Sequence, residues 1–151
     1  SAPIMLAWLG ALLMPITARQ KQLVQQSFAQ VEPIAEQAAE IFYQTLFQFD
    51  PNLKPLFKSD IKSQGQKLMA TLKLAVRGLD DLDGLIPVLH KLAERHVDYG
   101  VEAKDFTPVG NALLYTLKVG LGEQWTPELR QAWVDTFRTV ATVMKAHAFS
   151  D

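Results

Sequence analysis

The sequence predicts an all-α domain built from obliquely crossed helices. Apolar residues recur at the three- and four-residue spacing of a helix face along most of the chain, and no segment shows the alternation typical of a strand. Helix-start and helix-stop signals separate these segments and leave mostly short links. A very short segment at residues 50–56 turns the chain sharply, which argues against a regular up-and-down bundle.

The first three helices after the N-terminal segment have clear start signals. Thr17 and Gln20 have the spacing of a capping box and open the first helix. Pro33 can begin the second, because a proline in the first turn sacrifices no N–H that the helix needs. Asp50 and Pro51 are the N-cap and first residue of a third, very short helix that ends near residue 56.

Four further helices follow, bounded by polar caps and glycines. Ser59 or Asp60 is expected to cap a long helix that Gly78 stops, and Asp83 to open the next, which ends before Gly100. The last two helices are expected over residues 105–121 and from residue 127 onward.

Composition excludes several classes of function. The chain has 151 residues, so we expect one domain, with 48% hydrophobic and 21% charged residues and a net charge of -1. This charge offers no electrostatic basis for binding nucleic acid. The absence of cysteine excludes disulfides, thiolate nucleophiles and iron–sulfur clusters, and it is consistent with the reducing cytoplasm, where we expect the protein. The sequence contains no phosphate-binding glycine loop, HExxH or GxSxG motif.

Residues 1–16 form an apolar extension that precedes the domain expected at residues 17–151. The extension carries no charge, and its apolar block between Pro3 and Pro15 is too short to span a bilayer. We expect a short extra helix that packs on the domain or on a partner subunit, because Trp8 and Leu12 would otherwise expose an apolar patch. A homodimer formed through this segment is one expectation, and a monotopic membrane anchor is the alternative.

His96 is the candidate metal ligand. It stands near the end of a predicted helix, in a chain with only three histidines, and one imidazole cannot build a zinc or copper site from protein ligands alone. It can hold an iron whose equatorial ligands come from a porphyrin. Taken alone, a single histidine is more often an ordinary surface or core residue.

The residues around His96 and upstream of it resemble the globin family. More narrowly, the chain is similar to bacterial single-domain globins and to the haem domain of flavohaemoglobins, over roughly residues 17–144. The resemblance rests on the order and spacing of Ile41-Phe42-Tyr43-Gln44-Thr45-Leu46-Phe47, Pro51, Pro55-Leu56-Phe57, Ser63-Gln64-Gly65-Gln66-Lys67-Leu68-Met69 and the run from Leu92 to Val101.

This resemblance implies a globin fold and a bound haem (heme b), with His96 as the proximal iron ligand. Gln64 matches the distal position and Tyr43 a second distal position, so two hydrogen-bond donors would face a diatomic ligand such as O2, NO or CO. Many globins have histidine where this chain has Gln64. Because glutamine is a poor iron ligand, we expect an open, five-coordinate ferrous site, with Tyr43 as a possible phenolate ligand to ferric iron at high pH.

The resemblance also implies the lining of the pocket. Leu92 would lie under the porphyrin, and Lys67 and Arg95 could pair with its propionates or could be solvated surface charges. Plain core packing is the alternative for each apolar residue and is nearly as favoured for Leu113. The apolar candidates are Phe57, Leu68, Val101, Phe106, Val109 and Leu113.

The proximal side departs from the flavohaemoglobin pattern. There a tyrosine and a glutamate stand behind the proximal histidine, whereas this chain has Phe106 at the tyrosine position and no glutamate near residues 145–148. Peroxidase-like chemistry should therefore be weak. His90 and His147 match no family position and are expected to be exposed.

Two functions follow from the resemblance, and a third class stays open. The first is reversible binding of dioxygen for storage or transport, and the alternative is a nitric oxide dioxygenase supplied with electrons by an external reductase. A sensor is least favoured. A helical interaction module without haem is the different class, although it would have no need of His96.

Overall fold

The all-α prediction is confirmed. The computed structural model describes residues 16–57 and 60–149, and this part of the chain contains helices and no strand. The α-helices are α2 (Ala18–Val31), α3 (Ala35–Phe49), α4 (Ile61–Arg77), α5 (Leu82–Asp98), α6 (Phe106–Leu121) and α7 (Pro127–Ala148). Short 3-10 helices join them: η1 (Glu32–Ile34), η2 (Pro51–Leu56), η3 (Gly78–Asp80), η4 (Ala103–Asp105) and η5 (Gly122–Gln124).

Most of the predicted N-cap residues do cap their helices. The Thr17 side chain accepts from the Gln20 N–H, and the Gln20 side chain accepts from the Thr17 N–H, which completes the capping box. Asp60 caps α4. The expected start of α5 at Asp83 is wrong: Asp81 is the N-cap and accepts from the Gly84 N–H at 3.1 Å. Two aspartates stand close to this boundary, and the pattern of apolar residues does not distinguish them.

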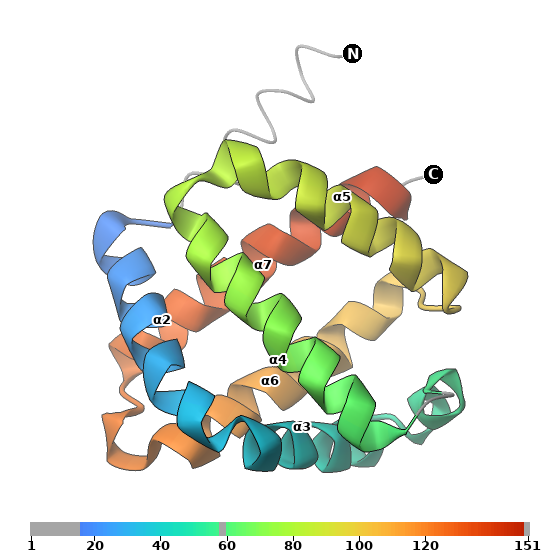
Figure 1. Ribbon diagram of the computed structural model, residues 1–151, viewed down its shortest axis with the longest axis horizontal. Helices are drawn as coiled ribbons and strands as arrows, with labels where there is room; N and C mark the ends of the chain where they lie inside the picture. The colour runs from blue at the N-terminus through green and yellow to red at the C-terminus, as the bar shows by residue number, and fades with distance from the viewer. Residues whose placement is uncertain (1–15, 58–59, 150–151) are drawn as a thin grey trace.

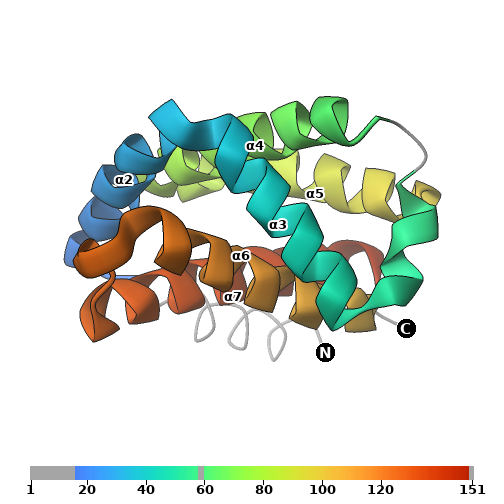
Figure 2. The ribbon, with the colours of Figure 1, turned by 90° about the horizontal axis from the view of Figure 1, so that it is seen from below.

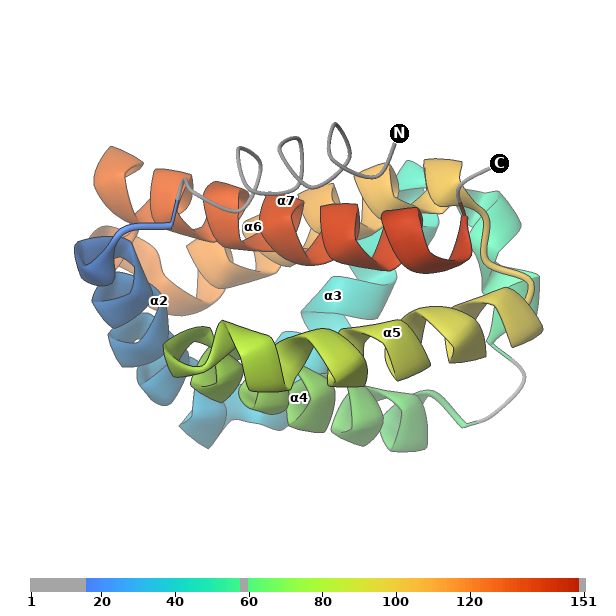
Figure 3. The ribbon, with the colours of Figure 1, turned by 90° about the horizontal axis from the view of Figure 1, so that it is seen from above.

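The helices form two layers with α3 crossing at one end. Helices α4 and α5 lie on one side of the molecule and α6 and α7 on the other (Figures 2 and 3). The chain turns between α4 and α5 at η3, so these two helices diverge from a shared corner (Figure 1). Helix α3 packs on both α6 and α4, and α5 packs on α7. This arrangement leaves the inward faces of α4 and α5 opposite α6 and α7.

A close crossing of α3 and α4 fixes the position of Tyr43. A Cβ atom placed on Gly65 would lie 2.8 Å from the Cβ of Ala39 and 4.0 Å from the Tyr43 ring. No side chain fits between the two backbones here, so α4 approaches α3 as closely as glycine allows. Tyr43 lies one turn beyond Ala39 on α3 and is therefore held against the first turns of α4.

The end of α5 is closed by a tight turn that follows His96. The Val101 N–H donates to the His96 carbonyl at 3.0 Å, and Gly100 has a φ of 91°. A residue with a side chain would be strained at that angle. A Cβ on Gly100 would also lie 3.3 Å from Leu56, which places the turn beside η2.

Residues 1–16 are predicted to form an extension that precedes the domain and packs on it or on a partner subunit. Its residues 1–15 lie outside the described part of the chain, so the expected extra helix there is not addressed. Ile16, the last residue of the predicted extension, is buried in the main apolar cluster of the domain. None of the described helices combines the length and the apolarity needed to cross a membrane.

Candidate functional site

Two apolar clusters lie on either side of the predicted site. The larger cluster contains Tyr43 and Leu113, with Phe57, Leu68 and Val109 packed against it. The smaller cluster joins α5, the start of α6 and the end of α7; it contains Phe106, with Leu92 packed against it. Tyr43, Phe57 and Leu68 therefore gather in one cluster, and Leu92 and Phe106 in the other. Leu113, for which core packing was nearly as favoured, is buried in the core.

The distal cluster is built around Tyr43. Its ring lies 5.2 Å from the Phe57 ring, centroid to centroid and nearly edge-on, and 6.0 Å from the Phe47 ring. Its phenol donates to the backbone carbonyl of Gln64 at 3.2 Å. The structure thus brings together Tyr43, Gln64 and Phe57 from α3, α4 and the η2 corner. Gln64 itself is half-buried.

Burial changes the acidity of the distal phenol. Tyr43 is 5% exposed, and desolvation of the charged form raises its pKa from 10.0 to about 12. The phenol therefore keeps its proton at all physiological pH values, and in this structure it donates that proton to the Gln64 carbonyl. The expectation that Tyr43 can bind ferric iron as a phenolate stays a prediction.

His96 is oriented by the backbone of its own helix. Its Nδ1 lies 2.7 Å from the carbonyl oxygen of Leu92, one turn earlier on α5. A carbonyl can only accept, so Nδ1 carries the proton and Nε2 has a free lone pair. Among the described residues nothing else hydrogen-bonds the ring, and Tyr99 contacts it at 6.3 Å between centroids. This partner was not predicted from the sequence, although the four-residue spacing between Leu92 and His96 on one helix was an available signal.

Phe106 stands in an apolar and cationic setting. It is buried, its ring meets the Phe149 ring edge-on at 5.5 Å, and the Lys145 ammonium lies 5.7 Å from its centroid. No carboxylate is paired with any of these groups in the described chain. The contacts of Lys145 and Phe149 were not predicted.

The two predicted propionate partners differ in position. Lys67 and Arg95 are both exposed, and neither forms an ion pair with a described residue. Arg95 and Leu92 line a cavity of about 210 Å³ between α4 and α5, whereas Lys67 does not. Val101 is half-buried in the turn that closes α5. These positions leave the roles of Lys67, Arg95 and Val101 as predictions.

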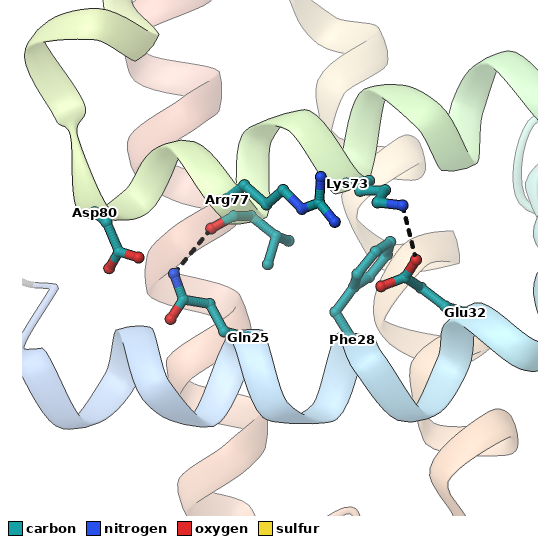
Figure 4. A pocket seen from close by; sticks show the side chains of 7 residues that line it. Gln25, Phe28, Glu32, Lys73, Arg77 and Asp80 are labelled. Atoms are coloured by element: carbon teal, nitrogen blue, oxygen red, sulfur yellow. Dashed lines mark hydrogen bonds and ion pairs between the residues drawn. The ribbon is translucent and has the colours of Figure 1, made fainter.

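A second cavity, between α2 and α4, contains no predicted site residue. Its volume is about 230 Å³, and its side chains are mostly charged or polar. Figure 4 shows the contacts that bridge it: Lys73 pairs with Glu32 at 3.3 Å, and the Gln25 amide donates to the Val76 carbonyl at 3.2 Å. These contacts join α2 to α4, and we assign the cavity a structural role.

The expectation that His90 and His147 are simply exposed is wrong for His90. His90 is half-buried, and the two imidazole rings stack with centroids 3.9 Å apart and planes 5° apart. His147 also lies 3.4 Å from the Glu94 carboxylate. The stack joins α5 to the last turn of α7. Sequence spacing could not reveal it, because the two histidines come from different helices.

Donor groups that could hold a metal ion by themselves are absent from the described residues: no three histidine or acidic side chains converge. A metal at His96 would need its other ligands from a cofactor. The half-buried apolar residues Phe57, Leu68, Leu92 and Val109, together with a histidine that presents a free Nε2, suit a large, flat, apolar ring system with a central metal.

Comparisons with known proteins agree with this arrangement. A family model described as Globin matches residues 40–144. The neuroglobin of Tetraodon nigroviridis is 31% identical over 143 residues, covering 85% of this chain and 90% of that protein. The flavohemoprotein of Chromobacterium violaceum is 35% identical over 107 residues, covering 68% of this chain and 26% of that protein.

The fold is also found among solved structures. An engineered carbene transferase built on a candidate nitric oxide dioxygenase from Rhodothermus marinus superposes with a TM-score of 0.80. The two chains are 23% identical, and the match covers 89% of this chain and 94% of that one. The predicted globin fold is thereby confirmed, and the family model covers more than half of the sequence. The chain belongs to the globin family.

Proposed function

We propose that this globin binds haem through His96 and binds dioxygen reversibly. The observation that carries the proposal is the hydrogen bond from His96 Nδ1 to the Leu92 carbonyl, which leaves Nε2 as the only ring nitrogen able to ligate iron. Haem supplies the iron at which a diatomic ligand binds. The flavohemoprotein that is similar to this chain supports the cofactor by its name.

The distal residues of this chain would act on the ligand by hydrogen bonding. Tyr43 keeps its proton, which it donates to the Gln64 backbone carbonyl in this structure and would redirect to a bound ligand, and the Gln64 side-chain amide would add a second donor from the neighbouring helix. Donors held in a water-poor pocket stabilise partial negative charge more than they would in water. Dioxygen, which becomes partly negative when it binds ferrous iron, would gain more from them than carbon monoxide. We therefore expect slow dissociation of dioxygen.

Nitric oxide dioxygenation is the second candidate function. It is supported by the same pair of donors, which would retain dioxygen long enough for nitric oxide to reach it. This activity requires an electron donor to restore ferrous iron, and we propose an external reductase for it. Phe106 stands where the flavohaemoglobin pattern has a tyrosine, and its ring contacts Phe149 and Lys145, so this position supplies no phenol that could strengthen the histidine as an electron donor, which argues against a peroxidase.

The cofactor is tested first by absorption spectroscopy of the purified protein, as isolated and after reduction with and without carbon monoxide. We expect a Soret band that shifts with carbon monoxide and a five-coordinate ferrous form before it is added. His96→Gly should lose the Soret spectrum of the wild type and regain it with added imidazole, which would replace the missing ligand. A protein that takes up no haem would overturn the proposal.

The role of the distal pair is tested by ligand kinetics. Tyr43→Phe and Gln64→Leu should each speed dioxygen dissociation by roughly tenfold or more, since each removes a hydrogen bond worth about 1.5 kcal/mol or more to a partly charged acceptor. Carbon monoxide dissociation should change far less, which is the internal control. Gln66→Leu, an exposed neighbour of Gln64, is the matched control variant. Turnover of nitric oxide with a reductase separates an enzyme from a carrier.

A further inference from the structure

The cavity between α2 and α4 contains two charged side chains that its structural contacts do not use. The ion pair between Lys73 and Glu32 and one amide hydrogen bond join the two helices across it. Arg77 and Asp80 also line this cavity, and both are exposed. Neither forms an ion pair with another residue in the described part of the chain. We call this cavity the α2–α4 cavity.

The two unpaired charges lie toward different ends of the α2–α4 cavity. Arg77 is the last residue of α4, and the chain turns through η3 from Gly78 to Asp80. In Figure 4 Asp80 stands at the end of the cavity next to Gln25, whereas the Arg77 guanidinium extends along α4 toward Lys73. The guanidinium and the carboxylate are therefore free to contact a molecule that lies between them.

Each end of the cavity has a distinct charge preference. Lys73, one turn before Arg77 on α4, is neutralised by Glu32 at 3.3 Å, so Arg77 supplies the uncompensated positive charge of its end. Asp80 follows the C-terminus of α4, where the helix carbonyls add partial negative charge to that of the carboxylate. One end thus favours an anionic group and the other a cationic group.

The lining between these ends includes apolar side chains. Phe28 and Val76 line the cavity and are almost fully buried. The Gln25 amide nitrogen donates to the Val76 carbonyl, which leaves the side-chain oxygen of Gln25 available as an acceptor. The cavity volume of about 230 Å³ is below the range of about 300–1,000 Å³ common for drug-sized ligands. These features suit a short aliphatic chain with a charged group at each end.

We propose that the α2–α4 cavity binds a small zwitterion, an amino carboxylate whose two charged groups are separated by a short methylene chain. Its carboxylate would accept hydrogen bonds from the Arg77 guanidinium, which can bind both oxygens. Its ammonium would donate to the Asp80 carboxylate and to the Gln25 side-chain oxygen, and its methylenes would contact Phe28 and Val76. The site uses no residue assigned to the haem, so it does not rest on the proposed function.

A phosphate or another anion without an ammonium group suits the cavity less well. Lys73 and Arg77 would attract it, but Glu32 and Asp80 line the same cavity and would repel it. The basic and acidic side chains of the lining balance, so a ligand with no net charge and one group of each sign matches them.

The site is tested by calorimetric titration of the protein, as isolated with its cofactor, with δ-aminovalerate, hexanoate and pentylamine. In hexanoate a methyl group replaces the ammonium of δ-aminovalerate, and in pentylamine a methyl group replaces its carboxylate. We expect one site per chain and binding of the zwitterion at least about threefold tighter than that of either singly charged probe. Across ω-amino carboxylates of increasing length, the affinity should pass through a maximum where the ligand spans Arg77 and Asp80.

Two substitutions assign the ends of the ligand. Arg77→Gln should bind δ-aminovalerate no more tightly than pentylamine, because the carboxylate loses its partner, and Asp80→Asn should bind it no more tightly than hexanoate. Both side chains are exposed, so we expect the variants to fold and to keep the haem spectrum of the wild type. Arg130→Gln and Asp83→Asn remove exposed charges on α7 and α5 and are the matched controls, which should bind as the wild type does.

The location of the ligand has its own readout, which is the nuclear magnetic resonance signal of the Gln25 side-chain amide during the same titration. We expect this signal to shift with δ-aminovalerate in the wild type and much less in Asp80→Asn. Calorimetric binding without a shift at Gln25 would place the zwitterion elsewhere and overturn the proposal.

Three further outcomes would overturn it. Hexanoate that binds as tightly as δ-aminovalerate would indicate a site for a simple anion at Arg77. Equal affinities for δ-aminovalerate in the wild type, Arg77→Gln and Asp80→Asn would remove the role of the two charges. No saturable binding of any ω-amino carboxylate would leave the α2–α4 cavity with its structural contacts alone.

Discussion

Tyr43 shows how burial and backbone contact determine what one side chain can do. Its phenol is nearly inaccessible to water, its proton points at the Gln64 carbonyl, and its pKa is raised. The same features that keep it neutral also keep it beside the proposed ligand position. The residue type was identified from the sequence. Its hydrogen bond to the backbone carbonyl of Gln64, rather than to the Gln64 side chain, could not be identified from the sequence, because every residue has a backbone carbonyl.

The raised pKa of Tyr43 predicts how stability changes in alkali. The unfolded chain loses the Tyr43 proton at pH 10.0, whereas the folded protein retains it to about pH 12. The neutral phenol thus contributes its full stability below pH 10, and this contribution falls as the pH rises from 10 to 12, by about 2 to 3 kcal/mol in total.

Denaturant unfolding of the wild type and Tyr43→Phe at pH 9 and above measures this effect. The wild type should lose stability relative to the variant only above pH 10, and the tyrosinate absorbance assigned to Tyr43 by difference should appear only near pH 12. An ionisation of Tyr43 near pH 10 in the folded protein would contradict the prediction.

At the scale of the elements, the crossing of α3 and α4 controls the distal pair. Gly65 and Ala39 allow the two helices to approach, and Tyr43 and Gln64 each lie within one turn of that contact. The helices themselves were predicted well, because caps and apolar spacing are local. Their crossing was not, since it depends on which small residues of two distant segments meet. The stack of His90 on His147 was missed for the same reason.

Gly65→Ala is predicted to disturb the site even though alanine favours helices. The new Cβ would lie 2.8 Å from the Ala39 Cβ, so the helices must move apart. We expect a destabilisation of about 1 to 3 kcal/mol by denaturant unfolding and faster dioxygen dissociation. Ala39→Gly in the same chain should restore much of the dissociation rate, because it reopens the space. If the double variant behaves as the single one, close approach at Gly65 is not the cause.

At the scale of the whole molecule, the two-layer arrangement places His96 on α5 and the distal residues on α3 and α4. The sequence predicted this because the family pattern is distributed in order along nearly the whole chain. It could not predict the cavity of about 210 Å³ between α4 and α5, whose lining joins two helices that diverge from one corner. Ile16, the last residue of the predicted extension, is part of the core cluster, which could not be predicted from the sequence. A single apolar residue at the boundary between two segments does not indicate which segment it packs with.

Removal of residues 1–15 tests the proposed self-association of the chain. These residues include Trp8, Leu9 and Leu12, and the truncation keeps Ile16, whose burial the domain needs. We expect the full chain to sediment as a dimer and the truncated chain as a monomer with unchanged haem spectra. Equal masses for the two proteins would rule out the role of this segment.

The acceptor that orients His96 is an atom of the main chain, and this affects how the protein can evolve. Substitution of Leu92 by another residue that maintains the helix would leave its carbonyl in place. Genetic drift at position 92 is therefore free to reshape the apolar wall beside the histidine without changing which ring nitrogen carries the proton. The tautomer of His96 is therefore set by the helical backbone and does not depend on which side chain occupies position 92.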